Sequence, residues 1–250
     1  MLEINKLYQG DCLEVMKQID DKSLDLILCD LPYGTTACKW DAIIPFEPLW
    51  EQYKRIIKDK GGVVLTASQP FTSKLVMSNI EMFKYDLTWD KQLTTGFLNA
   101  NRMPLRSHED ILVFYSKQPT YNPQKVKGEK NHSKGKMTSN INNDYGKFGK
   151  VDNSELLGEM KHPKSIISFE KPHPSKSIHP TQKPVALFEY LIKTYTNEGD
   201  LVLDNCIGSG TTACAAINTG RNFIGIEKDP EYFDIACKRI EDLQKQPKLF

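Results

Sequence analysis

Short apolar runs alternate with amphipathic segments at both ends of this chain. Runs such as Asp25–Cys29 and Asn222–Ile226 end in polar or turn residues, as expected for strands that are buried on both faces. The predicted strands are Leu7–Gln9, Asp25–Cys29, Gly62–Ala67, Asp86–Trp89, Ile111–Tyr115, Leu201–Leu203 and Asn222–Ile226. The predicted helices are Asp11–Ile19, Glu47–Asp59, Phe71–Ile80, Pro184–Thr196, Thr211–Asn218 and Pro230–Leu243. This alternation predicts an α/β fold in which helices cover both faces of a mostly parallel sheet of about seven strands.

The middle of the chain breaks this pattern. Residues 116–178 are rich in Asn, Ser, Gly and Pro, and they contain twelve lysines, no arginine and six acidic residues. The whole chain has a formal net charge of only +1, so this segment holds the positive charge. Such a composition is typical of a solvated insertion, and also of a surface that follows nucleic-acid phosphates. We therefore expect one domain built from residues 1–115 and 179–250, with an inserted region at 116–178.

Composition narrows the class of protein further. Hydrophobic residues make up 39% and charged residues 26% of the 250, as in a soluble globular protein. No apolar stretch reaches the roughly 18 residues that a membrane span needs, and the first residues do not resemble a secretory signal. The six cysteines form no CxxC pair, and the five histidines show no ligand spacing with them. We therefore expect a cytoplasmic protein that has reduced thiols and no metal site.

A glycine-rich turn follows the predicted strand Leu201–Leu203. Gly208 permits a tight turn, Gly210 lets a ligand approach the backbone, and the free amides of the next helix face the same crevice. Glu227, at the end of the following strand, can accept both hydroxyls of a ribose. Two alternative interpretations stay open. A lone glycine pattern is weak, so the turn could bind no ligand, and GSGTTA also fits the dinucleotide pattern G-x-G-x-x-A of nicotinamide enzymes. Asp204 would repel a pyrophosphate but attract an ammonium group, which favours a nucleoside ligand with a cationic amino acid end.

The tetrapeptide Asp30-Leu31-Pro32-Tyr33 follows a second predicted strand. The Asp30 carboxylate and the Leu31 carbonyl are two acceptors, Pro32 stiffens the turn, and Tyr33 offers a flat aromatic face. Two acceptors beside a stacking ring suit an exocyclic amine on a planar base. The plain alternative is an ordinary β-turn in which Asp caps and Tyr packs.

Three motifs together resemble those of the S-adenosylmethionine-dependent DNA amino-methyltransferases, which modify adenine N6 or cytosine N4. The motifs are the tetrapeptide, the turn from Asp204 to Thr211, and the segment from His179 to Pro184. Their order, with the tetrapeptide before the cofactor turn, is similar to that of the beta group of this family. The family tetrapeptide is usually Asp-Pro-Pro-Tyr, so Leu31 departs from it. This position offers mainly its backbone carbonyl, and we expect activity to survive the change.

The resemblance covers residues 7–115 and 179–243. It implies a three-layer, Rossmann-like methyltransferase sheet in which residues 116–178 form an inserted target-recognition region. Lysines of that region would contact DNA phosphates, and its Asn, Gln and His residues would read base edges.

The resemblance also implies a role for each motif residue. It assigns catalysis to Asp30, Leu31, Pro32 and Tyr33. It assigns cofactor binding to Asp11, Cys12, Asp30, His179, Thr181, Lys183, Asp204, Cys206, Gly208, Ser209, Gly210, Thr211, Glu227 and Lys228. By the family pattern Glu227 holds the ribose hydroxyls, Asp11 reads the adenine amine, and Lys183 belongs to the segment that reaches the methionine carboxylate. The stretches Trp89–Lys91 and Arg106–Glu109 are also similar to the family, and shape the base pocket or serve the structure alone.

The implied activity is a site-specific DNA methyltransferase that acts on adenine N6 in duplex DNA. The base would be flipped from the duplex, and the methyl group would pass to it directly and in line. Asp at position 30 resembles the adenine enzymes, whereas Ser is usual in cytosine-N4 enzymes, so adenine is favoured over cytosine.

Other functions stay open from the residues alone. These are an NAD-dependent oxidoreductase, a non-catalytic DNA-binding homologue, and methylation of RNA or of a protein glutamine, where Asn usually replaces Asp30. For a DNA methyltransferase the expected partner is double-stranded DNA. The family further implies a homodimer and a cognate restriction endonuclease in a restriction-modification system.

Overall fold

The structure, a computed structural model, describes residues 2–36, 38, 41–128, 160–171 and 182–245. The chain divides into two compact units, one formed by Met1–Asn122 with Ser165–Phe250 and the other by Pro123–Lys164. In the smaller unit, strands β6 (Val126–Lys127) and β7 (Met160–Lys161) pair in antiparallel fashion. None of the helices in the described ranges is long and apolar enough to cross a membrane.

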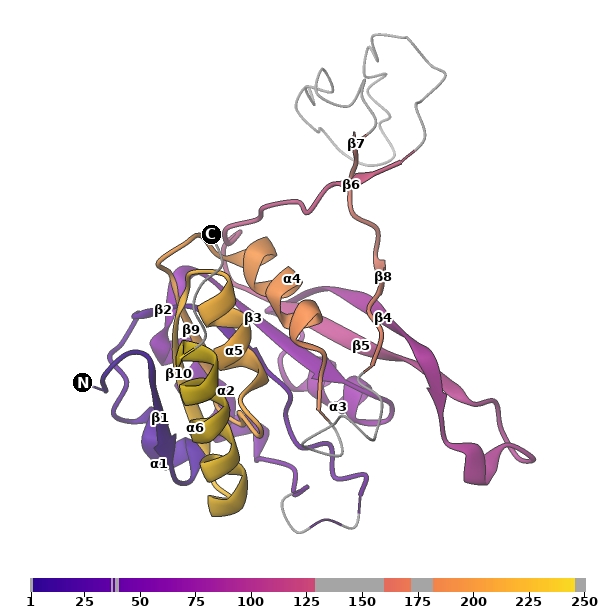
Figure 1. Ribbon diagram of the computed structural model, residues 1–250, viewed down its shortest axis with the longest axis horizontal. Helices are drawn as coiled ribbons and strands as arrows, with labels where there is room; N and C mark the ends of the chain where they lie inside the picture. Colours follow the sequence, from indigo (N-terminus) through magenta and orange to yellow (C-terminus); the bar gives the residue numbers. More distant parts are fainter. Residues whose placement is uncertain (1, 37, 39–40, 129–159, 172–181, 246–250) are drawn as a thin grey trace, which may run out of the picture. The chain divides into compact units, whose positions relative to one another are not determined.

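The larger unit contains an eight-stranded sheet with the strand order β1-β10-β9-β2-β3-β5-β4-β8 (Figure 1). The strands are β1 (Lys6–Gln9), β2 (Leu24–Cys29), β3 (Ile57–Ala67), β4 (Phe83–Thr95), β5 (Arg106–Phe114), β8 (Ile166–Ser168), β9 (Leu201–Asp204) and β10 (Asn222–Glu227). Only β5 runs antiparallel to its neighbours β3 and β4, so the sheet is mostly parallel, as predicted.

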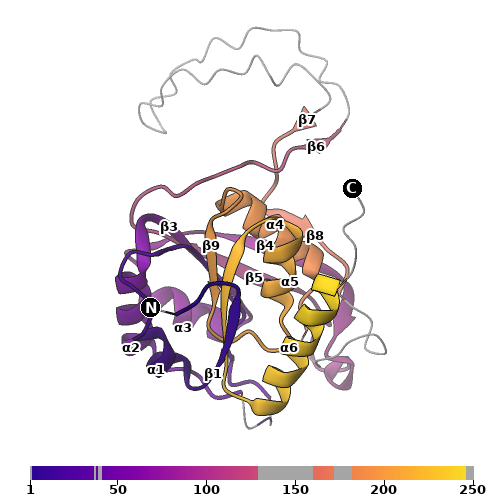
Figure 2. The same cartoon turned by 60° about the vertical axis from the view of Figure 1, so that its left-hand side comes forward.

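Helices form a layer on each face of this sheet (Figure 2). Helices α1 (Cys12–Met16), α2 (Phe46–Ile56) and α3 (Phe71–Ser78) cover one face, and α4 (Val185–Tyr195), α5 (Thr211–Asn218) and α6 (Pro230–Lys245) cover the other. The side chains of β2 alternate between the two layers, with Ile27 and Cys29 in one apolar cluster and Leu26 and Leu28 in the other. The period of two along a strand thus explains why an uninterrupted apolar run lies in the centre of three layers.

The predicted helix Glu47–Asp59 is too long at its carboxyl end. Helix α2 ends at Ile56, and Ile57 is already extended and opens β3. Ile57 is buried and pairs with Leu24, whereas the charged residues that follow it are exposed. Strand pairing therefore overrides the local helical pattern here.

The predicted strand Asp86–Trp89 covers only the middle of β4, and the predicted strand Ile111–Tyr115 covers only the carboxyl-terminal part of β5. Strands β4 and β5 extend beyond the body of the sheet, and the 3-10 helix η1 (Phe97–Asn99) lies in the connection between them. The extension is polar and largely exposed, so apolar periodicity gave no sign of it.

Candidate functional site

Four neighbouring parallel strands end at one edge of the sheet, and each is closed or followed by a carboxylate. The strands are β1, β10, β9 and β2, in that spatial order. Adjacent strands lie about 4.8 Å apart, so acidic side chains at their ends share a short stretch of edge. The carboxylates are Asp11, Glu227, Asp204 and Asp30. Ligands of open α/β sheets bind at such a carboxyl edge, where the strand order reverses.

A cavity of about 580 Å³ lies at this edge. Of the residues predicted to form the site, it is lined by Asp11, Cys12, Asp30, Leu31, Pro32, Tyr33, Lys183, Asp204, Cys206, Gly208, Ser209, Thr211, Glu227 and Lys228. His179 and Thr181 lie outside the described residues. The tertiary structure therefore brings the two distant motifs to one cavity.

Gly210 is the one described residue of the predicted set that does not line the cavity. Its φ of 84° is left-handed, and it immediately precedes α5. A Cβ atom at this position would lie 3.3 Å from the Cβ of Ala236 in α6. Gly210 therefore serves the turn and the close packing of α6 against it.

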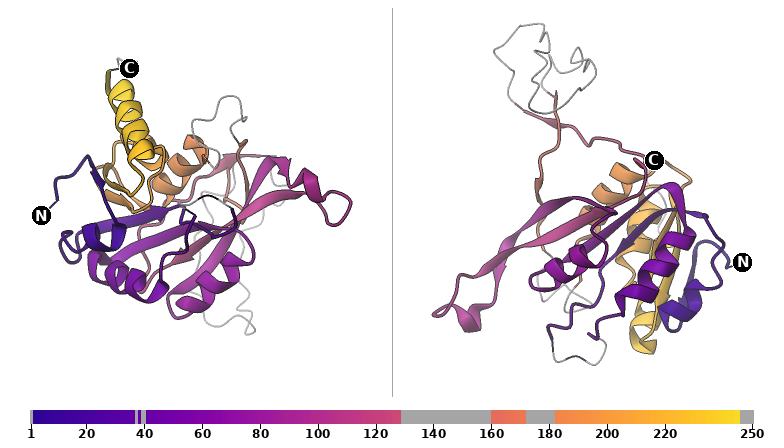
Figure 3. Two further views of the ribbon diagram at one scale, coloured as in Figure 1. Left: turned by 90° about the horizontal axis from the view of Figure 1, so that it is seen from below. Right: turned by 180° about the vertical axis from the view of Figure 1, so that it is seen from behind.

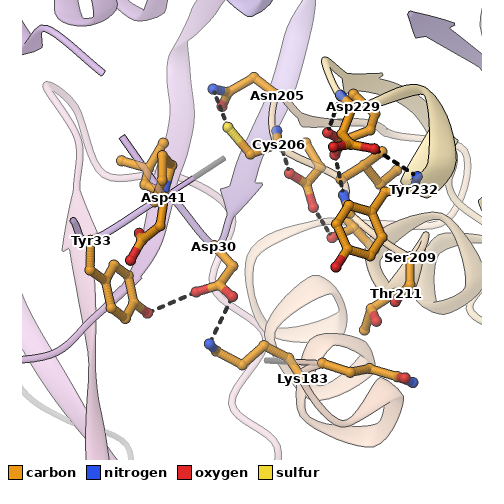
Figure 4. A pocket seen from close by; sticks show the side chains of 18 of the residues that line it. Asp30, Tyr33, Asp41, Lys183, Asn205, Cys206, Ser209, Thr211, Asp229 and Tyr232 are labelled. Carbon is orange, nitrogen blue, oxygen red and sulfur yellow. Dashed lines mark hydrogen bonds and ion pairs between the residues drawn. The ribbon is translucent and has the colours of Figure 1, made fainter. Parts of the chain in front are cut away.

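Asp30 is fixed through both of its carboxylate oxygens. Tyr33 donates its hydroxyl to Oδ1 at 2.7 Å, and the Thr66 hydroxyl also donates to Oδ1. Lys183 donates from Nζ to Oδ2 at 2.7 Å, a charge-assisted bond. Figure 4 shows the Asp30 carboxylate between the tyrosine and the lysine. The carboxylate is thus oriented before any substrate arrives.

Lys183 connects Asp30 to a second carboxylate. Its buried ammonium group lies 3.2 Å from Oε2 of Glu109, without the geometry of a hydrogen bond. Burial alone would lower the pKa of Lys183, but the two carboxylates outweigh burial and raise it. Glu109 also lies 3.4 Å from Nζ of Lys91, whose side chain is only 2% exposed. Burial lowers the pKa of Lys91, so its charge depends on Glu109.

The Tyr33 ring is packed as well as hydrogen bonded. It stacks on Phe71, with ring centroids 5.1 Å apart, and the Lys183 ammonium lies over it at 5.5 Å from the centroid. Burial, together with the nearby Asp30 and Glu109, raises the pKa of Tyr33, so its hydroxyl remains a donor.

The carboxylates of Asp204 and Glu227 lie at the other end of the cavity. Asp204 accepts hydrogen bonds from the Cys206 amide at 3.0 Å and from the Thr212 hydroxyl. Burial raises the pKa of Asp204 to about 6, in spite of these bonds. Glu227 accepts the amides of Gly208 and Asp229, both at 2.8 Å, and burial raises its pKa too.

These carboxylates fit a ligand with a cationic end and hydroxyl groups. Within the described ranges neither the Asp204 nor the Glu227 carboxylate forms an ion pair with a lysine or arginine, and the ammonium of Lys228, which follows Glu227, pairs with Asp11 instead. Asp11 at the same edge pairs with Lys228 at 3.1 Å, a contact that is largely exposed. S-adenosylmethionine carries an ammonium group, a sulfonium and a ribose, so the donor set present here suits it. Among the described residues no group of His, Cys, Asp and Glu could hold a metal ion.

Sequence reasoning missed several residues that shape the cavity. The Asp41 carboxylate accepts the amides of Gly34, Thr35 and Thr36 at 2.6–2.8 Å, and so fixes the loop after Tyr33. Burial would raise the pKa of Asp41, but these amide bonds outweigh it and lower the pKa. An Asp near a glycine turn is a weak signal, because such residues are common in turns.

Asn205, Asp229 and Tyr232 also line the cavity without having been predicted. Asp229 caps α6 by accepting the Glu231 amide at 2.9 Å. The stretches Trp89–Lys91 and Arg106–Glu109, left open by the sequence, contribute Trp89, Lys91, Arg106 and Glu109 to the lining.

Comparisons with known proteins agree with this geometry. The family model described as DNA methylase, N6_N4_Mtase, matches residues 24–238. The Type II methyltransferase M1.MboII of Moraxella bovis is 33% identical over 98% of this chain and 99% of its own length. The DNA adenine methyltransferase YhdJ of Escherichia coli is 30% identical over 96% of this chain and 83% of its own.

A solved structure is similar over nearly the whole chain. The crystal structure of the M1.HpyAVI–SAM complex has a TM-score of 0.63 and 27% sequence identity, and the match covers 94% of this chain and 98% of that one. The family model, the relatives and the site agree. The chain therefore belongs to the DNA amino-methyltransferases, which transfer methyl groups from S-adenosylmethionine to amino groups of DNA bases.

Proposed function

We propose that this protein methylates the N6 amino group of adenine at specific sites in duplex DNA, after the target base has left the stack. The observation that carries the proposal is the position of Asp30, which lies oriented by Tyr33 and Lys183 in the same cavity as Asp204 and Glu227. Asp rather than Ser at position 30 supports adenine over cytosine N4, as does the similarity to an adenine methyltransferase of Escherichia coli.

In this proposal, carboxylates hold S-adenosylmethionine, the methyl donor, at the end of the cavity that contains Asp204 and Glu227. Glu227, held by two backbone amides, accepts the ribose hydroxyls, and Asp204 faces the ammonium group. Asp11, beside Lys228, reads the amine of the cofactor's adenine. The methionine end lies among the cavity-lining residues Cys206, Gly208, Ser209 and Thr211. S-adenosylmethionine supplies a methyl group on a positively charged sulfur.

The acceptor end of the cavity orients the amine. Asp30 and the Leu31 carbonyl accept its two hydrogens, which leaves the nitrogen lone pair directed at the methyl group. The N–C bond would form as the S–C bond of the donor breaks, with that electron pair left on sulfur, and the methylated amine would then release one proton to solvent. Asp30 stabilises the positive charge that grows on the nitrogen, and this preoriented carboxylate needs little reorganisation. A base inside a duplex cannot reach such a cavity, so extrusion precedes transfer.

In this proposal Lys183 positions the carboxylate of Asp30. The resemblance assigned it to the segment that reaches the methionine carboxylate, yet its closest contacts are Asp30 and Glu109. It holds the Asp30 carboxylate in place until the base amine arrives. Because its ammonium lies over the Tyr33 ring, a base that stacks on this ring requires a shift of the Lys183 side chain.

Substrate and partners follow from the same proposal. Double-stranded DNA is the substrate, and residues 116–178 are the region that selects the target sequence. Its lysines make phosphate contacts whose strength falls with salt. We further propose that the protein is cytoplasmic, that it works as a homodimer, and that it belongs with a cognate endonuclease in a restriction-modification system.

The modified nucleoside tests the proposed specificity. DNA from cells that express the protein, and that lack other methyltransferases, should contain N6-methyladenine after enzymatic digestion and mass spectrometry. The same DNA from cells that express Asp30→Ala is the control. N4-methylcytosine in place of N6-methyladenine would contradict the assignment to adenine.

Asp30→Asn should separate catalysis from cofactor binding. The variant retains the shape of the side chain but loses its charge, so kcat should fall by about 10²–10³ while the donor still binds. Titration calorimetry with S-adenosylmethionine and a radiolabelled methyl-transfer assay measure the two effects. Asp86→Asn, at an exposed position of β4, is the matched control. Turnover near that of the wild type would reject Asp30 as the amine acceptor.

Lys183→Met tests whether the lysine serves Asp30 or the methionine carboxylate. If it serves Asp30, kcat should fall by about tenfold or more, while the Kd for S-adenosylmethionine changes by less than about threefold. Lys183→Arg should recover part of kcat, because it restores the charge. A large loss of affinity for the donor with unchanged kcat would return Lys183 to the cofactor end.

The raised pKa of Asp204 predicts a pH dependence of donor binding. The carboxyl group has a pKa of about 6 without ligand, and a cationic ligand binds its ionised form. The affinity for S-adenosylmethionine should therefore be about tenfold lower at pH 5 than at pH 7, since each pH unit below the pKa costs a factor of ten. Calorimetry across this range measures it. Asp204→Asn should bind weakly and show a flatter profile; an unchanged profile would contradict the contact.

A further inference from the structure

The connection between β4 and β5 forms an arm that projects away from the sheet (Figures 1 and 3). Beyond the pair Asp90–His108 the ladder is interrupted, and only Thr95 and Arg106 pair again. Between them the chain turns through Gly96, with φ of 90°, and the short helix η1. The arm is defined here as residues 91–106.

The tip of this arm is apolar and unprotected. Phe97 is 81% exposed, Leu98 100% and Met103 57%. A single exposed apolar residue is ordinary, but three on one projecting turn indicate a surface that meets a partner.

The charge of the arm indicates what that partner is. Residues 91–106 contain Lys91, Arg102 and Arg106 and no acidic residue. Lys91 is buried against Glu109, so the cations that the arm exposes are Arg102 and Arg106. An apolar tip on an arm that exposes cations and has no acidic residue is complementary to a polyanion with an apolar interior, which describes a DNA duplex.

The base of the arm belongs to the cavity. Lys91, Thr95 and Arg106 line it, and Arg106 is held there by donating to the Ser68 hydroxyl at 2.6 Å. Leu98 is three residues from Thr95, so their Cα atoms lie at most about 10 Å apart. That distance is about three steps along a DNA strand, at about 3.4 Å per step.

We propose that Phe97 and Leu98 insert into the duplex beside the target base and occupy the space in the stack that the extruded base leaves. Extrusion breaks the stacking and pairing of the target base, and an apolar wedge offsets part of this cost. Arg102, on the same arm, contacts the neighbouring phosphates. This inference rests on the proposed function, because it requires a base to enter the cavity.

A comparison of duplex and single-stranded substrate tests the wedge. The double variant Phe97→Ala/Leu98→Ala is assayed with labelled S-adenosylmethionine on unmethylated genomic DNA, either native or heat-denatured and quickly cooled. The ratio of the duplex rate to the single-strand rate should fall about tenfold, because only the duplex requires extrusion. Met77→Ala, at a position in α3 that is 71% exposed, is the control and should leave the ratio unchanged. An unchanged ratio in the double variant, or equal losses on both substrates, overturns the proposal.

Photocrosslinking gives a second, independent measurement. Leu98→p-benzoylphenylalanine should crosslink to native DNA on irradiation, whereas the same substitution of Met77 should not. A crosslink from position 98 to a second copy of the chain, or none to DNA, would show that the arm serves another contact.

The two proposals can fail separately. If the wild type transfers no methyl group to either form of DNA, the proposed function fails. If the wild type does transfer methyl groups and the arm variants behave like the control, only the wedge fails.

Discussion

The parallel pairing of β2 with β9 is the contact on which the site depends. It sets Leu26 beside Val202 and Ile27 beside Leu203, although these residues are about 175 positions apart in the chain. Closing so long a loop costs entropy, and burial of both strands between two helical layers offsets that cost. Because the strands are parallel, both end at the same edge. The tetrapeptide that follows β2 and the glycine-rich turn that follows β9 therefore line one cavity.

The same parallel arrangement explains the electrostatics of the edge. Carboxylates at four adjacent strand ends repel one another and lose hydration on burial. The fold compensates this repulsion and loss of hydration in a different way at each end of the cavity. Asp30 and Glu109 are balanced by Lys183 and Lys91, whereas Asp204 and Glu227 receive mainly hydrogen bonds from amides and hydroxyl groups. The balanced end suits an uncharged base, and the unbalanced end suits a cationic cofactor.

Two features of the structure alter how individual residues are understood. Gly210 supports the approach of α6 instead of lining the cavity, and Lys183 contacts Asp30 directly. Both lie in motifs that the sequence predicted to form one site, and other residues of these motifs line one cavity. A motif indicates which segments meet, but the side-chain contacts within a site depend on rotamers and on neighbours from other segments. Glu109, which reaches Lys183 from β5, is such a neighbour.

The sequence by itself determined the α/β class, the presence but not the exact bounds of seven strands and six helices in the larger unit, and two of the turns that line the cavity. These follow from local rules, because apolar periodicity reports burial and Gly, Pro and Asp report turns. The tertiary structure alone decided the order of the strands, the end of α2 at Ile56, and the polar extension of β4 and β5. It also decided which cation meets Asp30. These features depend on pairing between distant segments, and the pattern of neighbouring residues carries no record of which distant partner a segment will find.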